Sequence, residues 1–222
     1  MKKLAILRRA GLACFIGLLG SCLPDAGDPP DYTDHADLIP PVETLPVIAP
    51  DPFQPGDARL AVGLFYEGGR SETIPINGLT TNYFIFEGSY QQQTSTDRLE
   101  GQTSDELTLN GTSFWGGGII WSEPIDLSDW TTMYVGFKSS DPSFENFDLT
   151  LQSGVTSTDT VLDPAAYGYT NDGEWHFLQI PLQDAIDAGF DPSTVRSPFI
   201  IGAAGGVAGE VLLVDNLYFT ND

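Results

Sequence analysis

The stretch from residue 167 to residue 182, YGYTNDGEWHFLQIPL, gathers side chains that could contact a ligand. Flat aromatic rings stack against the C–H faces of pyranose sugars, while amides and carboxylates bind paired hydroxyl groups. The candidate rings and polar partners in this stretch are Tyr167, Tyr169, Asn171, Asp172, Trp175 and Gln179. The same pattern also describes a hairpin whose aromatic residues are buried in a core, and both interpretations stay open at this point.

Two further rings, Trp115 and Trp121, flank a glycine triplet and join the candidates for a ligand-binding surface. Residues 90–93, YQQQ, add amides in what we expect to be a long polar loop. Large aromatic residues are more often part of a core than of a binding surface. For Trp175 in particular, packing at the edge of a sandwich is as well supported as ligand contact.

The chemistry needed for catalysis is poorly supported. His176 shares its strand face with Leu178 and Ile180, which indicates a buried or edge histidine, and no G-x-S-x-G nucleophile turn occurs in the chain. An acid-pair glycosidase needs only two carboxylates, and the acidic residues here cluster in turns and near the N-terminus. We therefore predict that the protein is not an enzyme, with a small glycosidase as the less favoured alternative.

The elements that must position these residues are short strands. Apolar residues alternate with polar ones, most clearly in FDLTLQ at 147–152, and turn residues such as Asn110-Gly111 separate the segments. Pro181 should end the strand 175–180, because proline cannot donate to a ladder. One short helix is expected at 182–188, ended by Gly189. The pattern predicts one all-β domain at residues 58–222, and the expected strands are 60–66, 83–87, 107–109, 114–121, 133–138, 147–152, 175–180, 199–202 and 211–219.

The first 57 residues are of a different kind. Basic residues precede a short apolar run that ends LLGSC, which is typical of a secretory signal and too short to span a bilayer. The ending resembles the bacterial lipobox, which implies cleavage after residue 21 and lipidation of Cys22. A soluble secreted protein with an accidental cysteine is the alternative. Residues 22–57 are rich in proline and acid and predict a mostly extended tether.

Charge limits the partners. The full chain of 222 residues carries a formal charge of −22, and removal of residues 1–21 leaves five Lys/Arg against 31 Asp/Glu, or −26. Such a field repels phosphate backbones and anionic lipid surfaces. We therefore expect no nucleic-acid partner, and contact with a membrane only through the lipid. Cys14 lies in the signal, so the mature chain has one thiol and no internal disulfide.

Several segments in order resemble the galactose-binding-like jelly roll of many carbohydrate-binding modules. They are FYEGG at 65–69, EGQTSDEL at 100–107, PIDLSDW at 124–130, GFKSSD at 136–141, WHFLQIPL at 175–182 and VDNLYF at 214–219. The resemblance implies a jelly-roll-like antiparallel β-sandwich that binds sugar without chemistry, often with one structural Ca²⁺. Glu67 and Asp215 match the acids that meet around this ion. An unpaired carboxylate in an apolar strand is costly, which also points to a cation, although Asp215 could instead accept backbone N–H bonds.

We therefore expect a monomeric glycan-binding module, lipid-anchored at a bacterial cell envelope, with the outer membrane as the expected location. The alternative from another class is a structural or protein-interaction lipoprotein without a sugar site. A sheet face with exposed rings and amides favours the first, and a ring-free polar face favours the second.

Overall fold

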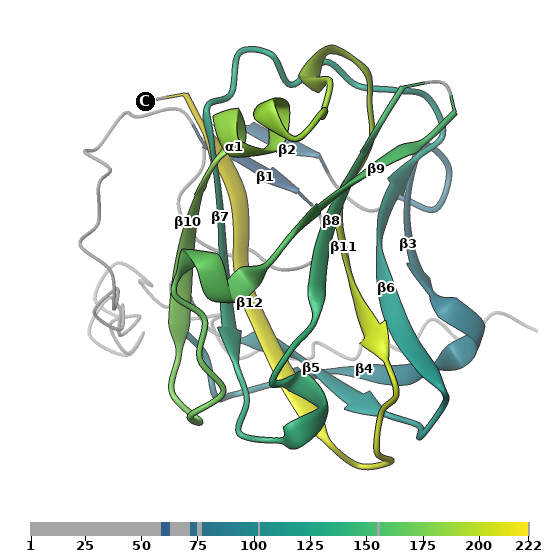
Figure 1. Ribbon diagram of the computed structural model, residues 1–222, viewed down its shortest axis with the longest axis vertical. Coiled ribbons are helices and arrows are strands. Elements are labelled where there is room, and N and C mark those ends of the chain that lie inside the picture. The colour runs from purple at the N-terminus through teal and green to yellow at the C-terminus, as the bar shows by residue number, and fades with distance from the viewer. Residues whose placement is uncertain (1–58, 63–71, 75–76, 102, 155, 222) are drawn as a thin grey trace, which may run out of the picture. The chain divides into compact units, whose positions relative to one another are not determined.

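The computed structural model describes residues 59–62, 72–74, 77–101, 103–154 and 156–221. They belong to one compact unit and form a sandwich of two β-sheets (Figure 1). The predicted all-β fold is thereby confirmed. The signal peptide, Cys22, the tether and Glu67 lie outside the described residues. Within the described ones, no helix has the length and apolar character needed to cross a membrane.

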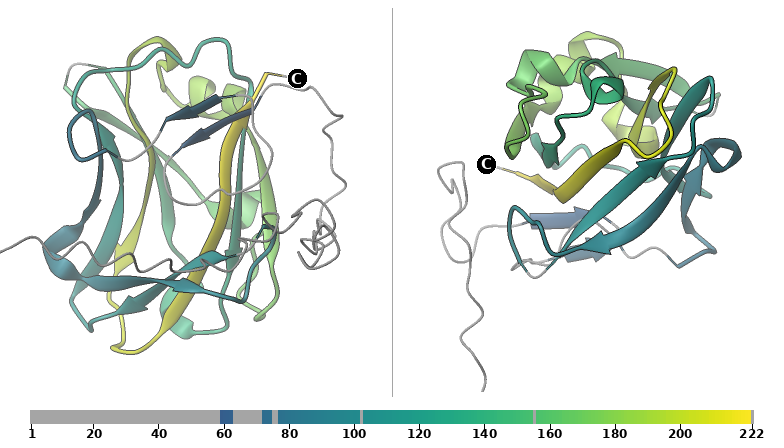
Figure 2. Two further views of the ribbon diagram at one scale, coloured as in Figure 1. Left: turned by 180° about the vertical axis from the view of Figure 1, so that it is seen from behind. Right: turned by 90° about the horizontal axis from the view of Figure 1, so that it is seen from below.

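The first sheet is built around the long C-terminal strand β12. Its antiparallel order is β10-β7-β12-β5-β4, and the first half of β12 pairs with β5. The second half pairs with β1, and β2 pairs with β1 in parallel. Figure 2 shows the pair β4–β5 and the pair β1–β2 at opposite ends of β12, the yellow strand. The strands are β1 Arg59–Val62, β2 Glu72–Ile74, β4 Tyr90–Ser95, β5 Ser104–Leu109, β7 Thr132–Lys138, β10 His176–Pro181 and β12 Val211–Thr220.

The second sheet has the order β3-β6-β11-β8-β9 and is antiparallel throughout. Its strands are β3 Thr81–Ile85, β6 Phe114–Trp121, β8 Asp148–Ser153, β9 Thr158–Leu162 and β11 Val195–Ala204. The helix α1, Leu182–Asp187, follows β10 directly. As predicted, Pro181 ends the strand and Gly189, at φ 106°, follows the end of the helix.

Three strands differ from the sequence prediction. The polar residues 90–93 form β4 rather than a loop, and β2 and β9 were not predicted. The sequence pattern does not reveal β4, because a strand is recognised by apolar residues at every second position and β4 has only one, Tyr90. Tyr90 faces inward, and Gln91 and Gln93 face outward. The strand is held instead by six register pairs with β5.

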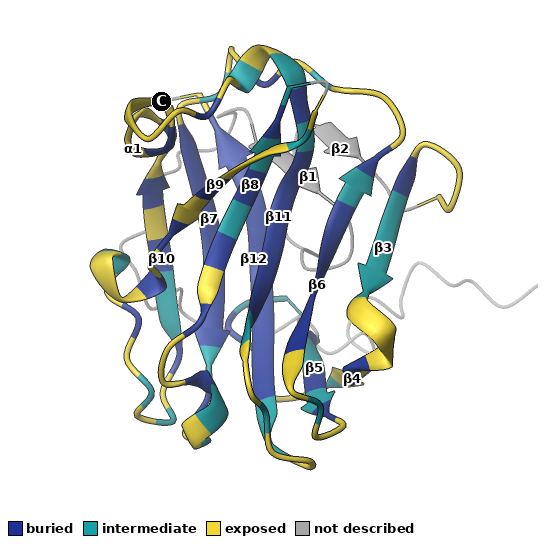
Figure 3. Cartoon of the chain, turned by 45° about the vertical axis from the view of Figure 1, so that its right-hand side comes forward, coloured by how far each residue is buried: buried dark blue, intermediate teal, exposed yellow. Residues whose placement is uncertain are grey.

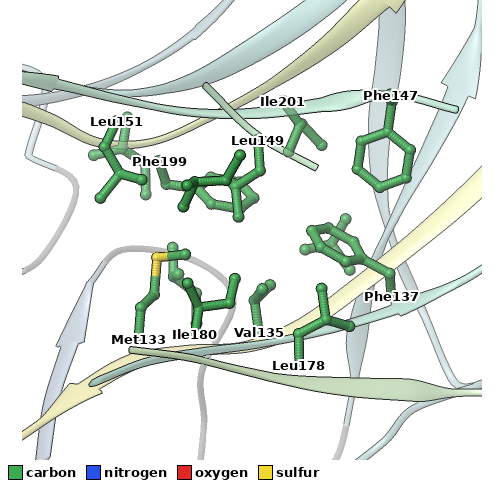
Figure 4. Packing of buried hydrophobic residues seen from close by; sticks show 14 of the residues in the cluster. Met133, Val135, Phe137, Phe147, Leu149, Leu151, Leu178, Ile180, Phe199 and Ile201 are labelled. Atoms are coloured by element: carbon green, nitrogen blue, oxygen red, sulfur yellow. The ribbon is translucent and has the colours of Figure 1, made fainter. Parts of the chain in front are cut away.

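The core lies between the sheets. Met133, Val135 and Phe137 of β7 face Leu149 and Leu151 of β8 across the sandwich (Figure 4). Residues from β10 and β11 extend both layers, and rings such as Phe137 and Phe147 meet edge to face at 5.2 Å. Burial of these side chains supplies most of the stabilising free energy, at about 25 cal/mol per Å² of apolar surface. Period two places the alternate residues of every strand on an outer face.

The glycine triplet of β6 is explained by close approach. A Cβ atom added to Gly117 would lie 2.1 Å from the Tyr90 hydroxyl oxygen. This hydroxyl forms a 2.6 Å hydrogen bond with that of Tyr83, inside the sandwich. Burial, the largest cause, raises the pKa of both tyrosines far above the ordinary value. Gly117 is therefore needed for space, because a side chain at this position would meet the Tyr90 hydroxyl.

Candidate functional site

The predicted ring loop before β10 is tied into the fold. Tyr169 is buried, and its hydroxyl donates to the Phe144 carbonyl at 3.0 Å. Tyr167 is half-buried, and its hydroxyl donates to the Asp184 carboxylate of α1 at 3.2 Å. The Tyr169 ring therefore belongs to the core and cannot lie against a ligand, which corrects that part of the prediction.

The polar residues of this loop serve the turn. The Asn171 side-chain amide donates to the Asp141 carbonyl at 3.0 Å. Asp172 Oδ1 accepts the Glu174 N–H at 3.0 Å and lies 2.8 Å from His176 Nε2. The His176 contact, followed by the backbone bond, lowers the pKa of Asp172 to about 2. These contacts stabilise the turn, in which Asn171 is half-buried and Asp172 is exposed.

His176 does not form a catalytic relay. Its Nε2 atom contacts both Asp172 Oδ1 at 2.8 Å and the Thr170 hydroxyl at 3.0 Å. A relay needs the nucleophile on one ring nitrogen and the carboxylate on the other. Both partners share one nitrogen here, so the arrangement is a surface hydrogen-bond cluster.

Trp175 lies on the outer face of the first sheet and is 8% exposed. Its ring is packed with Leu99 and Leu213, and its indole N–H donates to Asp97 at 3.0 Å. Asp97 also pairs with Lys138 at 2.7 Å. Trp175 therefore packs the edge of the sandwich, which was one of its two sequence interpretations. Gln179 is exposed on β10.

Trp115 and Trp121 are each 1% exposed and lie in the main core. Trp115 meets Phe144 edge to face at 5.0 Å. The prediction that these two rings reach a ligand is wrong, because both occupy the inward-facing positions of β6. Sequence period alone gives two faces for a strand and does not say which of them meets the other sheet.

Asp215 is 2% exposed in β12. Its Oδ2 accepts the N–H groups of Leu99 at 2.8 Å and Glu100 at 3.1 Å, and its Oδ1 accepts that of Asn216 at 2.8 Å. Asn216, at φ 56°, follows Asp215 in the bulge that interrupts the pairing of β12 with β7. Burial raises the pKa of Asp215 to about 7, despite the three N–H donors. In the described part of the chain, no three His, Cys, Asp or Glu side chains cluster to hold a metal.

An exposed ring platform that the sequence analysis missed lies on the outer face of the second sheet. Phe86 is 41% exposed and Phe114 is 48% exposed, with ring centres 5.7 Å apart. A Cβ atom at Gly116 would lie 3.1 Å from the Phe86 ring and 3.2 Å from the Phe114 ring. At Gly202, it would lie 3.2 Å from Phe114. Both rings thus rest on glycine backbone, with part of their surface open to solvent.

The two rings line a surface hollow of about 290 Å³ together with Glu87, Thr112 and Ser113. Its polar groups are one carboxylate and two hydroxyls. The Thr112 hydroxyl donates to the Phe114 carbonyl at 2.5 Å, which leaves its oxygen able to accept. Figure 3 shows the exposed turn after β3 and the exposed start of β6 beside each other. Rings next to a few polar groups are the composition of a small-ligand site.

The turn that carries Glu87 is held in place by β6 and by the loop before it. Residues Phe86–Gly88 form a 3-10 turn in which Glu87 has a φ of 46°, unusual for a residue with a side chain. The buried Ser89 hydroxyl accepts the Gly116 N–H at 3.1 Å. Asn110 donates its side-chain amide to the Gly88 carbonyl at 2.6 Å. Strained residues persist only where surroundings hold them, and they are frequent at binding sites.

A sequence signal for this platform does exist. In FWGGGIIW, period two puts Phe114 on the face of Gly116 and Gly118, opposite the two tryptophans. The other residues of that face are Gly116, Gly118 and Ile120, so a phenylalanine at the start of the strand has only glycine as its neighbour on the same face. That pattern favours an exposed ring, once the tryptophan face is known to be the buried one.

No protein-family model matches the chain, and no curated protein matches it. Solved structures do match. The family 30 carbohydrate-binding module of the cellulosomal cellulase Cel9D-Cel44B of Clostridium thermocellum is 18% identical, with a TM-score of 0.51, over 64% of this chain and 92% of that one. Another family 30 module structure is 18% identical, with a TM-score of 0.50, over 63% and 81%.

A third similar structure is an exo-β-agarase, which is 13% identical with a TM-score of 0.50. The match covers 64% of this chain and 23% of the agarase. At these identities the likeness concerns the fold. The chain has the β-sandwich fold that is found in carbohydrate-binding modules.

Proposed function

We propose that this chain is a non-catalytic polysaccharide-binding module, and that the Phe86–Phe114 platform is its sugar-binding surface. The observation that carries the proposal is the pair of exposed rings over glycine backbone, in a hollow with one carboxylate and two hydroxyls. The face of one ring would stack on the C–H side of a sugar, with the second ring edge-on to the first at 70°, and the polar groups would bind the sugar hydroxyls. The similar structures, named as carbohydrate-binding modules of a cellulase and as an agarase, support a polysaccharide as the ligand class.

Absence of chemistry is part of the proposal. Hydrolysis by an acid pair needs two carboxylates about 5 to 9.5 Å apart on either side of the bond. Among its described lining residues, the hollow holds the single carboxylate of Glu87. The alternative of a protein-interaction role rests on the same fold, and the ring platform favours sugar over it.

A glycan array tests this proposal, with Phe114→Ala as the decisive variant. Loss of one stacking ring should weaken glycan binding about tenfold, on the basis of about 0.5–1.5 kcal/mol for a ring contact plus its buried area. Leu79→Ala is the matched control, because it removes an apolar side chain that is 80% exposed elsewhere. Array binding that Phe114→Ala leaves unchanged would place the sugar site elsewhere. A blank array would favour the structural alternative.

The cellular setting is proposed from the sequence. We infer that lipid on Cys22 displays the sandwich at a bacterial cell envelope, at the outer membrane, with residues 23–57 as tether. Two or more acyl chains give stable anchoring, whereas one gives only marginal binding.

A structural Ca²⁺ at Asp215 and Glu67 also remains a proposal. Asp215 fits in chemistry: it is a hard oxygen donor, buried, and among the described residues no cation pairs with it. Its N–H partners occupy part of the carboxylate, so the ion would take the remaining lone pairs. A lower melting temperature in EDTA, restored by Ca²⁺, is the expected result.

A further inference from the structure

A second carboxylate lies on the far side of the ring platform from Glu87. In the register of the second sheet, Gly116 of β6 pairs with Gly202 of β11, and Gly202 pairs with Asp148 of β8. Asp148 is exposed, while its neighbour Leu149 is fully buried in the core. Asp148 therefore stands on the outer face, in the same row as the glycines under the rings.

The distance between neighbouring strands gives the positions of Glu87 and Asp148 relative to the rings. The Phe114 ring tip lies over Gly202, and neighbouring strands are about 4.8 Å apart. Asp148 is therefore one strand beyond the ring. Glu87 follows β3, on the opposite side, so the row from β3 to β8 spans three strand spacings, or about 14 Å. A sugar stacked on Phe114 would lie between the two carboxylates.

The charge of this row is negative at both ends. Arg196 is the described basic residue of β11, and its guanidinium donates to the Ser122 carbonyl at 2.6 Å. It lies six residues from Gly202 along β11, or about 20 Å. Neither carboxylate of the row is therefore neutralised by Arg196, and the excess of acid over the whole chain adds to the same field.

We propose that Asp148 is a specificity-determining residue of the platform, which selects neutral polysaccharides over anionic ones. This rests on the glycan-binding function proposed above. Asp148 accepts hydroxyl hydrogens from the sugar unit beyond Phe114, and it repels a carboxyl or sulfate group in the same place. The ligand chain then runs across the strands, from Glu87 over the rings to Asp148.

The distance between the strands that carry Glu87 and Asp148 also bears on whether these two carboxylates could hydrolyse a glycosidic bond. The two strand positions are about 14 Å apart, whereas the carboxyl groups of an acid pair around one glycosidic bond lie within about 9.5 Å of each other, so a pair would form only if both side chains leaned over the rings. The two carboxylates thus contact different sugar units of a bound chain.

Matched neutral and charged polymers test the proposal by affinity gel electrophoresis. The probes are hydroxyethylcellulose against carboxymethylcellulose, and laminarin against sulfated laminarin. Wild-type protein should be retarded more strongly by the neutral member of a pair. Asp148→Asn keeps the size and hydrogen bonding of the side chain but removes its charge. It should bind the anionic member about three- to tenfold more tightly than wild type, and the gain should shrink in high salt because exposed charges are screened.

Asp159→Asn on β9 is the control, because it removes an exposed carboxylate of the same sheet that accepts from Gln152 at 2.8 Å. A gain of binding cannot come from misfolding. Two results would refute the role of Asp148 while wild type still binds. In the first, Asp148→Asn has the same ratio of affinity for the neutral polymer to affinity for the anionic polymer as wild type. In the second, Asp159→Asn changes this ratio as much as Asp148→Asn does. Failure of wild type to bind either neutral polymer would refute both proposals for these glucans.

Discussion

Replacing Asp215 with asparagine should remove most of the pH dependence of folding stability between pH 5 and pH 8. The wild-type carboxylate is buried in the bulge of β12, and burial raises its pKa from 3.8 to about 7. Its folded pKa thus lies above its unfolded pKa. The resulting stability is complete below pH 4, falls as the unfolded state ionises, and is lost once the pH passes 7.

The size of the effect follows from these two pKa values. One pKa unit corresponds to about 1.36 kcal/mol, so the whole shift is worth about 4 kcal/mol. Between pH 5 and pH 8, linkage gives a loss of about 2–3 kcal/mol in the free energy of unfolding. The local effect should be largest at Asn216 and Leu99, because their N–H groups donate hydrogen bonds to this carboxylate.

Urea unfolding followed by tryptophan fluorescence measures this directly, because Trp115 and Trp121 are buried. Wild type should lose stability from pH 5 to pH 8, and the Asp215→Asn profile should be flatter by about 2–3 kcal/mol. Asp159→Asn, an exposed carboxylate, should keep the wild-type slope. Equal slopes in wild type and Asp215→Asn would refute the argument.

Calcium can be tested in the same measurement. A cation on Asp215 would favour the ionised form and lower its pKa. Added Ca²⁺ should then raise stability at pH 8 and flatten the wild-type profile, and Asp215→Asn should not respond. A profile that is identical in Ca²⁺ and in EDTA would argue against the ion.

Other predictions concern the core and the anchor. Gly117→Ala should destabilise the fold by several kcal/mol, because its Cβ would meet the Tyr90 hydroxyl; a melting temperature equal to that of wild type would contradict the described packing. Trp115→Ala should cost about 3–5 kcal/mol in urea unfolding, since the ring is buried, and a loss below about 1 kcal/mol would show that the ring is not in the core. Cys22→Ala should abolish labelling by palmitate, and persistent labelling would refute the lipid anchor.

Local sequence patterns determined much of the fold. Alternating residues in 133–138 and 147–152 marked β7 and β8, because a half-buried strand must present apolar side chains every second residue. Pro181 and Gly189 marked the ends of β10 and α1 for equally local reasons, a missing N–H and a positive φ. The jelly-roll-like sandwich was implied by the resemblance of six ordered segments to galactose-binding-like modules.

Only the tertiary structure decided which rings face outward. A strand has two faces, and the one that becomes core depends on where the opposite sheet lies. Trp115 and Trp121 therefore proved buried, and Phe114 exposed, although all belong to one strand. The proposed site depends on long-range register as well, because Phe114 and Asp148 lie on neighbouring parts of one sheet face only through the pairing of β6, β11 and β8.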